Sequence, residues 1–226
     1  MTLTINSKMK KLILTCLAAA CSFAAHADNP LYETGPGQDS SFVRFLNASG
    51  DKATIVNGAA KVSLDAKTEG RVSRFYPVKA GDKLTATVQV GGAKTAVEVV
   101  AKPGEFVTVA ILNKGTALES VQVRETPTDF NAMRASISLL NADPACASAG
   151  LTGGAKNAMI FEAVKPATTT RRLVNPVSLK VQANCGGEVA GAAVDMSQLQ
   201  AGERYSVIVI PSKKGRQTFF VRDSTS

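Results

Sequence analysis

Residues 41–48 read Ser-Phe-Val-Arg-Phe-Leu-Asn-Ala, and residues 136–142 repeat this pattern as Ser-Ile-Ser-Leu-Leu-Asn-Ala. Further along each copy, residues 84–90 run into Gly-Gly, and residues 179–185 do the same. The shared asparagines, Asn47 and Asn141, are 94 positions apart, and the offset grows to about 100 further on. A separation of this length indicates a duplicated domain rather than a short solenoid repeat.

Both copies have the pattern of β-strands. Residues 84–90 alternate apolar and polar side chains, as a half-buried strand does, whereas residues 106–112 and 205–210 are apolar on both faces and predict central strands. Dipeptides such as Asn57-Gly58 mark tight turns between the strands. The sequence therefore predicts an all-β fold of two tandem small β-sandwich domains. Residues 196–200 are the one stretch in which we consider a short helical turn.

Composition changes divide the chain into five parts. We expect a signal peptide at 1–27, an extended N-terminal arm at 28–40, a first sandwich at 41–125, a short polar linker at 126–133 and a second sandwich at 134–226. With 45% apolar and 19% charged residues the chain can bury a core, which excludes bulk disorder.

The N-terminus has the features of a cleaved export signal. Three lysines precede a short apolar run at residues 12–20, and Ala25 and Ala27 occupy the positions that signal peptidase reads. The run is short for a membrane span, although a retained anchor and a lipoprotein acylated at Cys21 remain alternatives. The predicted location is the periplasm, with no transmembrane segment in the mature chain.

The net charge of the mature chain favours anionic partners only modestly. Three of the 26 basic residues and none of the 18 acidic residues lie in the signal, so the mature net charge is 23 − 18 = +5. Such a balance suits an acidic polysaccharide or lipid head groups, and it also suits an ordinary basic surface. Few aromatic side chains are available for stacking, which argues against a nucleic-acid partner.

The only histidine, His26, lies inside the predicted signal. A mature chain without imidazole cannot assemble a Ser-His-Asp or Cys-His nucleophile by itself, and a His-rich metal site is excluded. We therefore expect no catalytic residue, no metal and no cofactor. Paired carboxylates such as Asp65 and Glu69 could still support hydrolysis, but their positions are typical of turns, so a His-independent activity is a weak alternative.

Two cysteines remain after cleavage, and an even pair in an exported chain predicts a structural disulfide between Cys146 and Cys185. The surrounding Gly- and Ala-rich stretch, residues 143–157, is expected to be a long loop that the disulfide holds in place.

Arginines on or beside the predicted strands are the candidate contacts for a polyanion or a protein partner, because a guanidinium binds carboxylates with two parallel hydrogen bonds. Protection of edge strands is the competing explanation. Together with one tyrosine of the arm, the candidates are Tyr32, Arg44, Arg71, Arg74, Arg124, Arg171, Arg172 and Arg222.

The beginning of the mature chain resembles a known family. Leu31-Tyr32, then Gly35-Pro36-Gly37, then the segment Ser-Ser-Phe-Val-Arg at 40–44 are similar to the alginate O-acetylation protein AlgF family. The resemblance extends over nearly the whole mature chain, and the segment at 40–44 is its most specific part. The cysteine pair and the enlarged stretch at 143–157 depart from the family pattern, so the polymer could be alginate or a related exopolysaccharide.

This resemblance implies a non-catalytic periplasmic adaptor that is required for O-acetylation of an exopolysaccharide. Its implied partners are a membrane-bound O-acyltransferase and periplasmic SGNH-type acetyltransferases, which would carry out the transfer chemistry. Two alternatives remain: a module that binds an anionic polysaccharide, and a chaperone-like β-sandwich protein that docks partners by strand addition.

Overall fold

The computed structural model describes residues 40–67, 70–128 and 130–225. The predicted signal peptide lies outside the described residues, as does the predicted arm apart from Ser40. In the part of the chain that the structure describes, no helix is long and apolar enough to cross a bilayer.

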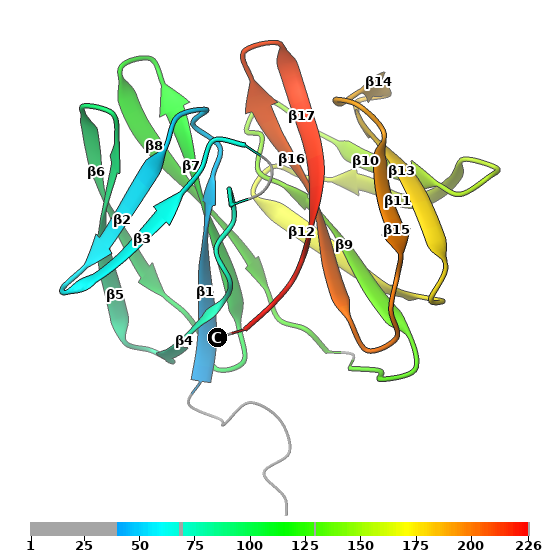
Figure 1. The fold of residues 1–226 in the computed structure, drawn as a ribbon, viewed down its shortest axis with the longest axis horizontal. Helices are drawn as coiled ribbons and strands as arrows, with labels where there is room; N and C mark the ends of the chain where they lie inside the picture. The colour runs from blue at the N-terminus through cyan, green and yellow to red at the C-terminus, as the bar shows by residue number, and fades with distance from the viewer. Residues whose placement is uncertain (1–39, 68–69, 129, 226) are drawn as a thin grey trace, which may run out of the picture. The chain divides into compact units, whose positions relative to one another are not determined.

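The first sandwich contains eight strands in two four-stranded sheets, with strand orders β4-β1-β7-β8 and β3-β2-β5-β6 (Figure 1). Its strands are β1 Ser40–Asn47, β2 Ala53–Asn57, β3 Ala60–Leu64, β4 Tyr76–Lys79, β5 Lys83–Val90, β6 Ala93–Val100, β7 Phe106–Lys114 and β8 Ala117–Glu125.

The second sandwich repeats this topology, with strand orders β12-β9-β16-β17 and β11-β10-β13-β14, and β15 also pairs with β13. Its strands are β9 Ala135–Asn141, β10 Ala149–Gly153, β11 Ala158–Val164, β12 Thr168–Val174, β13 Ser178–Cys185, β14 Glu188–Val189, β15 Val194–Gln198, β16 Arg204–Ser212 and β17 Gly215–Arg222. Each sandwich pairs its first strand in parallel with a later one, β1 with β7 and β9 with β16. The predicted fold class is confirmed, and the sequence repeat corresponds to a structural one.

Each sandwich has its own apolar core, and a third apolar cluster joins them. Leu46 of β1 and Leu140 of β9 lie in this third cluster with residues of β7, β8, β16 and β17. The sheets β4-β1-β7-β8 and β12-β9-β16-β17 are therefore called the facing sheets, and their contact is called the inter-sandwich interface. It explains why β7 and β16 are apolar on both faces: one face lies in a sandwich core and the other in the interface.

Two local expectations are wrong. Residues 196–200 form no helical turn, because most of them belong to strand β15, in which Ser197 has a left-handed φ of 51°. Residues 143–157 are not entirely loop, because β10 lies within them and pairs with β13. A Gly- and Ala-rich strand carries little of the usual strand signal.

Candidate functional site

The predicted disulfide is confirmed. Cys146 and Cys185 are bonded, with their Cα atoms 5.6 Å apart. Cys185 ends β13 opposite Ala149, the first residue of β10, so the bond ties the segment before β10 to the strand beside it. Cys146 is fully buried in the core of the second sandwich, which is the environment of a structural disulfide rather than a reactive one.

The repeated asparagine has a structural role in both sandwiches. The side-chain amide of Asn47 donates to the carbonyl oxygens of Asp51 and Asp65, at 2.6 and 2.9 Å. Asn141 donates in the same way to Cys146 and Val164, at 2.8 and 3.0 Å. Both side chains are fully buried, so the motif stabilises the chain reversal after the first strand of each copy.

Arg44 lies inside the inter-sandwich interface. Its guanidinium donates to Thr108 of its own sandwich at 2.9 Å, and to Ser206 and Asp223 of the other at 3.0 and 2.7 Å. The exposed fractions of the Arg44 and Asp223 side chains are only 3% and 5%, so neither contacts solvent appreciably. Arg44 is thus a structural residue that joins the sandwiches, and this placement corrects its expected role as an external contact.

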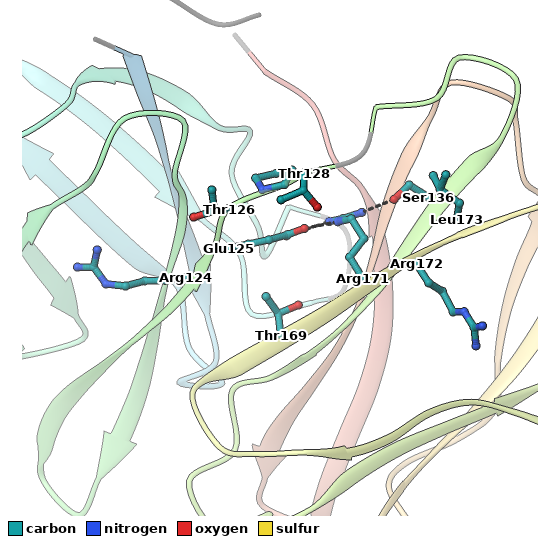
Figure 2. Close-up of a pocket in the computed structure, with 10 residues that line it drawn as sticks. Arg124, Glu125, Thr126, Thr128, Ser136, Thr169, Arg171, Arg172 and Leu173 are labelled. Atoms are coloured by element: carbon teal, nitrogen blue, oxygen red, sulfur yellow. Dashed lines mark hydrogen bonds and ion pairs between the residues drawn. The ribbon is translucent and has the colours of Figure 1, made fainter. Parts of the chain in front are cut away.

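Arg171 extends this polar cluster to the surface. It donates to Asp223 at 2.9 Å and forms an ion pair with Glu125, the last residue of β8. Arg204 also pairs with Glu125, at 3.3 Å. Figure 2 shows Arg171 pointing at Glu125 from the opposite wall of a cleft. Three arginines and two carboxylates thus form one connected group, which we call the interface charge cluster: Arg44, Arg171, Arg204, Glu125 and Asp223.

The cluster keeps Asp223 ionised. Burial by itself raises the pKa of the Asp223 carboxyl, but the charges of Arg44 and Arg171 and the hydrogen bond from Ser206 outweigh it and hold the pKa below the usual value. For Arg204, burial and the nearby Arg171 lower the pKa of the guanidinium. An arginine side chain nevertheless stays protonated at neutral pH. The cluster is therefore ionic, and it carries one more positive than negative charge.

The internal repeat accounts for much of this arrangement. Glu125 follows Val123-Arg124, and Asp223 follows Val221-Arg222, so the two carboxylates that Arg171 bridges are repeat-equivalent. The preceding arginines are equivalent as well: Arg124 pairs with Glu105, and Arg222 pairs with Glu203. Each of these two ion pairs joins a strand of a facing sheet to the residue just before the neighbouring strand.

Beside the cluster lies a cleft of about 390 Å³ between the end of β8 and strand β12 (Figure 2). The cleft brings together three of the predicted residues, Arg124, Arg171 and Arg172. Arg172 is exposed and donates to the carbonyl of Ile160 at 2.9 Å. Thr126, Thr128, Thr169 and Ser136 add hydroxyl groups to the lining. The hydroxyl groups suit a ligand with oxygen acceptors, whereas the guanidinium groups of Arg124 and Arg171 already pair with carboxylates of the protein.

The other predicted residues lie elsewhere. Arg71 is buried, where its guanidinium donates to Gln217 at 2.8 Å and lies 5.5 Å from the Phe219 ring centroid. Arg74 is exposed beside the ring of Tyr76. Arg222 is exposed and paired with Glu203. Tyr32 lies outside the described residues. The structure therefore does not unite the predicted arginines into one surface.

Sequence reasoning did not single out Glu125 or Asp223. The sequence did contain a signal for both acids. Each follows a repeated Val-Arg pair, and Arg44 lies among apolar residues of a strand, so its side chain is expected to be buried. A buried arginine requires a carboxylate, so two repeat-equivalent acids were the natural candidates. In the described ranges, no group of three or more Cys, Asp or Glu residues is placed to hold a metal ion.

Comparison with known proteins leaves the function open. No family model matches the chain, and no curated protein matches it. Two solved structures show some likeness. The first is a "putative cell adhesion protein" from Bacteroides uniformis, with 11% identity and a TM-score of 0.29, covering 84% of this chain and 99% of that one. The second, of the same description, is from Bacteroides ovatus, with 9% identity and a TM-score of 0.26, covering 81% and 96%. Likenesses at these scores carry no conclusion about function.

Proposed function

We propose that this chain is an exported, non-catalytic adaptor for O-acetylation of an exopolysaccharide, either alginate or a related polymer. In this role it links a membrane-bound O-acyltransferase with periplasmic SGNH-type acetyltransferases. The resemblance at residues 31–44 and the predicted export signal are the sequence support for the proposal.

The observation that carries the proposal is the interface charge cluster. Arg44 crosses from β1 to Ser206 and Asp223, and Arg171 returns from β12 to Glu125, so each sandwich contributes a cation to a carboxylate of the other. A buried ion pair is expensive to separate, so these contacts favour a fixed joint over independent movement of two domains. A fixed joint suits a protein that holds two partners at a constant separation.

A deletion strain tests the role directly. Loss of the gene is expected to abolish acetylation of the polymer, measured by NMR of purified polysaccharide, while the amount of polymer stays close to that of the parent strain. Complementation with the wild-type gene should restore acetylation. Normal acetylation in the deletion strain would overturn the proposal, and loss of the polymer itself would favour a role in polymer binding or export instead.

A second measurement tests the absence of catalysis. Purified protein is expected to release no acetate from acetylated polymer or from p-nitrophenyl acetate above the uncatalysed rate. Activity that copurifies with the chain through two different columns would contradict this expectation.

A further inference from the structure

Three neighbouring clefts follow one strand, β12. The cleft of Figure 2 shares Arg171 and Arg172 with a second cleft of about 420 Å³, which reaches residues 159–162 on β11. It shares Ser136 and Leu173 with a third cleft of about 250 Å³, which reaches Phe130 and Arg134. Because neighbouring clefts share lining residues, they adjoin one another along β12, and we call the three together the β12 groove.

The strand along this groove has an unpaired edge. Within the described residues β12 pairs only with β9, and its seven residues follow β9 without a register shift. In an antiparallel pair, alternate residues point their N–H and C=O groups away from the partner strand. The outer edge of β12 therefore offers main-chain donors and acceptors, of which the carbonyl of Leu173 already accepts from Arg134. By contrast, β11 of the same sandwich shifts register twice against β10 and offers no such regular edge.

The groove is basic. Among its lining residues the arginines outnumber the glutamates five to three, and Glu125 and Glu203 are already paired with arginines. Arg134 and Arg172 are exposed and donate only to carbonyl oxygens, those of Leu173 and Ile160. Neither has a carboxylate partner among the described residues, so both have hydrogen-bond donors left for an external carboxylate.

One end of the groove also offers apolar surface. Phe130 is 66% exposed and lines the third cleft, and Met133, which is 79% exposed, lies three residues further along. The Phe130 ring lies 5.4 Å from the guanidinium of Arg204, which restrains it. An exposed aromatic side chain held in this way is typical of an anchor in a protein interface.

We propose that the β12 groove binds an extended acidic segment of a partner protein, added as a further strand to the edge of β12. The main-chain groups of this edge supply register, Arg134 and Arg172 bind carboxylates on alternate residues, and Phe130 contacts an apolar residue at one end. A peptide fits better than a sugar chain, because the described lining has two aromatic rings, those of Phe130 and Phe161, and only the ring of Phe130 is exposed for stacking against sugars. The inference deepens the adaptor role and rests on it for the identity of the partner, but the groove can be tested without that partner.

The binding test uses the full mature chain and a fluorescein-labelled heptapeptide with alternating Glu and Val. Fluorescence anisotropy is expected to show saturable binding that weakens as salt is raised. A peptide with Lys in place of Glu should not bind, and N-methylation of alternate peptide nitrogens should abolish binding, since it removes the main-chain donors of one edge.

Matched variants locate the binding. Arg172→Glu and Arg134→Glu are each expected to weaken binding about tenfold or more, because an attraction becomes a repulsion. Lys213→Glu makes the same charge change in the exposed β16–β17 turn, outside the three clefts, and is expected to have little effect. Arg172→Gln, which keeps a polar side chain, and thermal unfolding of every variant guard against a folding defect.

Several outcomes would overturn the proposal. These are equal binding by wild type and Arg172→Glu, tolerance of N-methylation, or absence of saturable binding at low salt. Tighter, arginine-dependent binding of oligogalacturonate would assign the groove to an acidic polysaccharide instead. A strain carrying Arg172→Glu that acetylates normally would remove the groove from the adaptor role, whereas only the deletion strain can remove the adaptor role itself.

Discussion

The two sandwiches share a strand order but place their interface arginines on different strands. β1 carries Arg44, whereas the corresponding position of β9 is Ser138, which donates to Ser206 at 3.1 Å. The edge strand beside each of these strands shows the reverse. In the second sandwich, Arg171 of β12 lies opposite Ser138. In the first sandwich, the residue beside Arg44 is Phe75, because the next residue, Tyr76, pairs with Val43. Arg44 lies over the ring of Phe75, 4.3 Å from its centroid.

This exchange shows how a duplicated sheet can pack against its own copy. Here one copy supplies its arginine from the central strand and the other from the edge strand, while both keep their acids, Glu125 and Asp223. The arginines of the two copies therefore reach the shared carboxylates from different strands.

The largest expected effect comes from the buried acid. Asp223→Ala leaves Arg44 and Arg171 without their shared carboxylate, and removal of one partner of a buried ion pair costs about 3–5 kcal/mol of unfolding free energy. Glu125→Ala, at the equivalent but more exposed position, should cost less. Urea denaturation measures both. Equal losses would contradict the idea that the copies contribute unequally to the interface.

The disulfide between Cys146 and Cys185 stabilises the second sandwich. Replacing Cys146 and Cys185 together by Ala is expected to lower the unfolding free energy by about 4 kcal/mol, because the loop they close becomes free in the unfolded chain. Hydrogen exchange should show the loss mainly in strands β10 and β13. If β2 and β5 of the first sandwich lose as much protection, then the two cores unfold together.

The asparagines test what the copies have in common. Asn47→Ala and Asn141→Ala each remove buried hydrogen bonds to main-chain carbonyls, and each is expected to cost about 2 kcal/mol. Thermal unfolding of the two variants side by side measures the difference. A much larger cost for one of them would show that the repeated motif has different roles in the two sandwiches.

Acid should loosen the interface. The pKa of Asp223 is lower in the folded chain than its ordinary value, so its stabilising contribution is complete above that value. The contribution is lost as pH falls below about 4 toward the folded pKa. The unfolding free energy of wild type should therefore fall more steeply with acid than that of Asp223→Asn. Parallel curves for the two proteins would refute this assignment.

The smallest effect concerns backbone strain. In the described residues, non-glycine residues with left-handed φ all lie in the second sandwich, among them Ala163 at 52° and Ala167 at 58°. Glycine adopts this conformation without the steric penalty, so Ala167→Gly is expected to change stability by no more than about 1 kcal/mol, in the stabilising direction. Ala110→Gly, in the interior of strand β7, is the control that should destabilise.

The sequence predicted the layered β architecture because strand periodicity and the internal repeat are local signals. Residues 106–112 and 205–210 were identified as central strands from their apolar faces alone, and the cysteine pair followed from counting. The charge cluster could not be predicted in the same way, because Arg44 and Asp223 are 179 positions apart and meet only when the facing sheets pack. Exposure was equally hidden: Arg71 and Arg172 are both predicted as contacts for a partner, yet one is buried and the other lies in a groove.

The end of the described chain has a consequence for the order of folding. Thr225 forms a parallel bridge with Phe75, and the main-chain N–H of Phe75 donates to the carbonyl of Ser224 at 2.8 Å. The first sandwich thus receives a main-chain partner from Ser224 and Thr225, which are made 99 and 100 positions after the end of its final strand. A nascent chain can form β1 to β8 early, but that sandwich stays incomplete until the last described residues emerge. A chain truncated before Asp223 lacks these contacts. We therefore expect its first sandwich, which is far from the cut in sequence, to become sensitive to proteases.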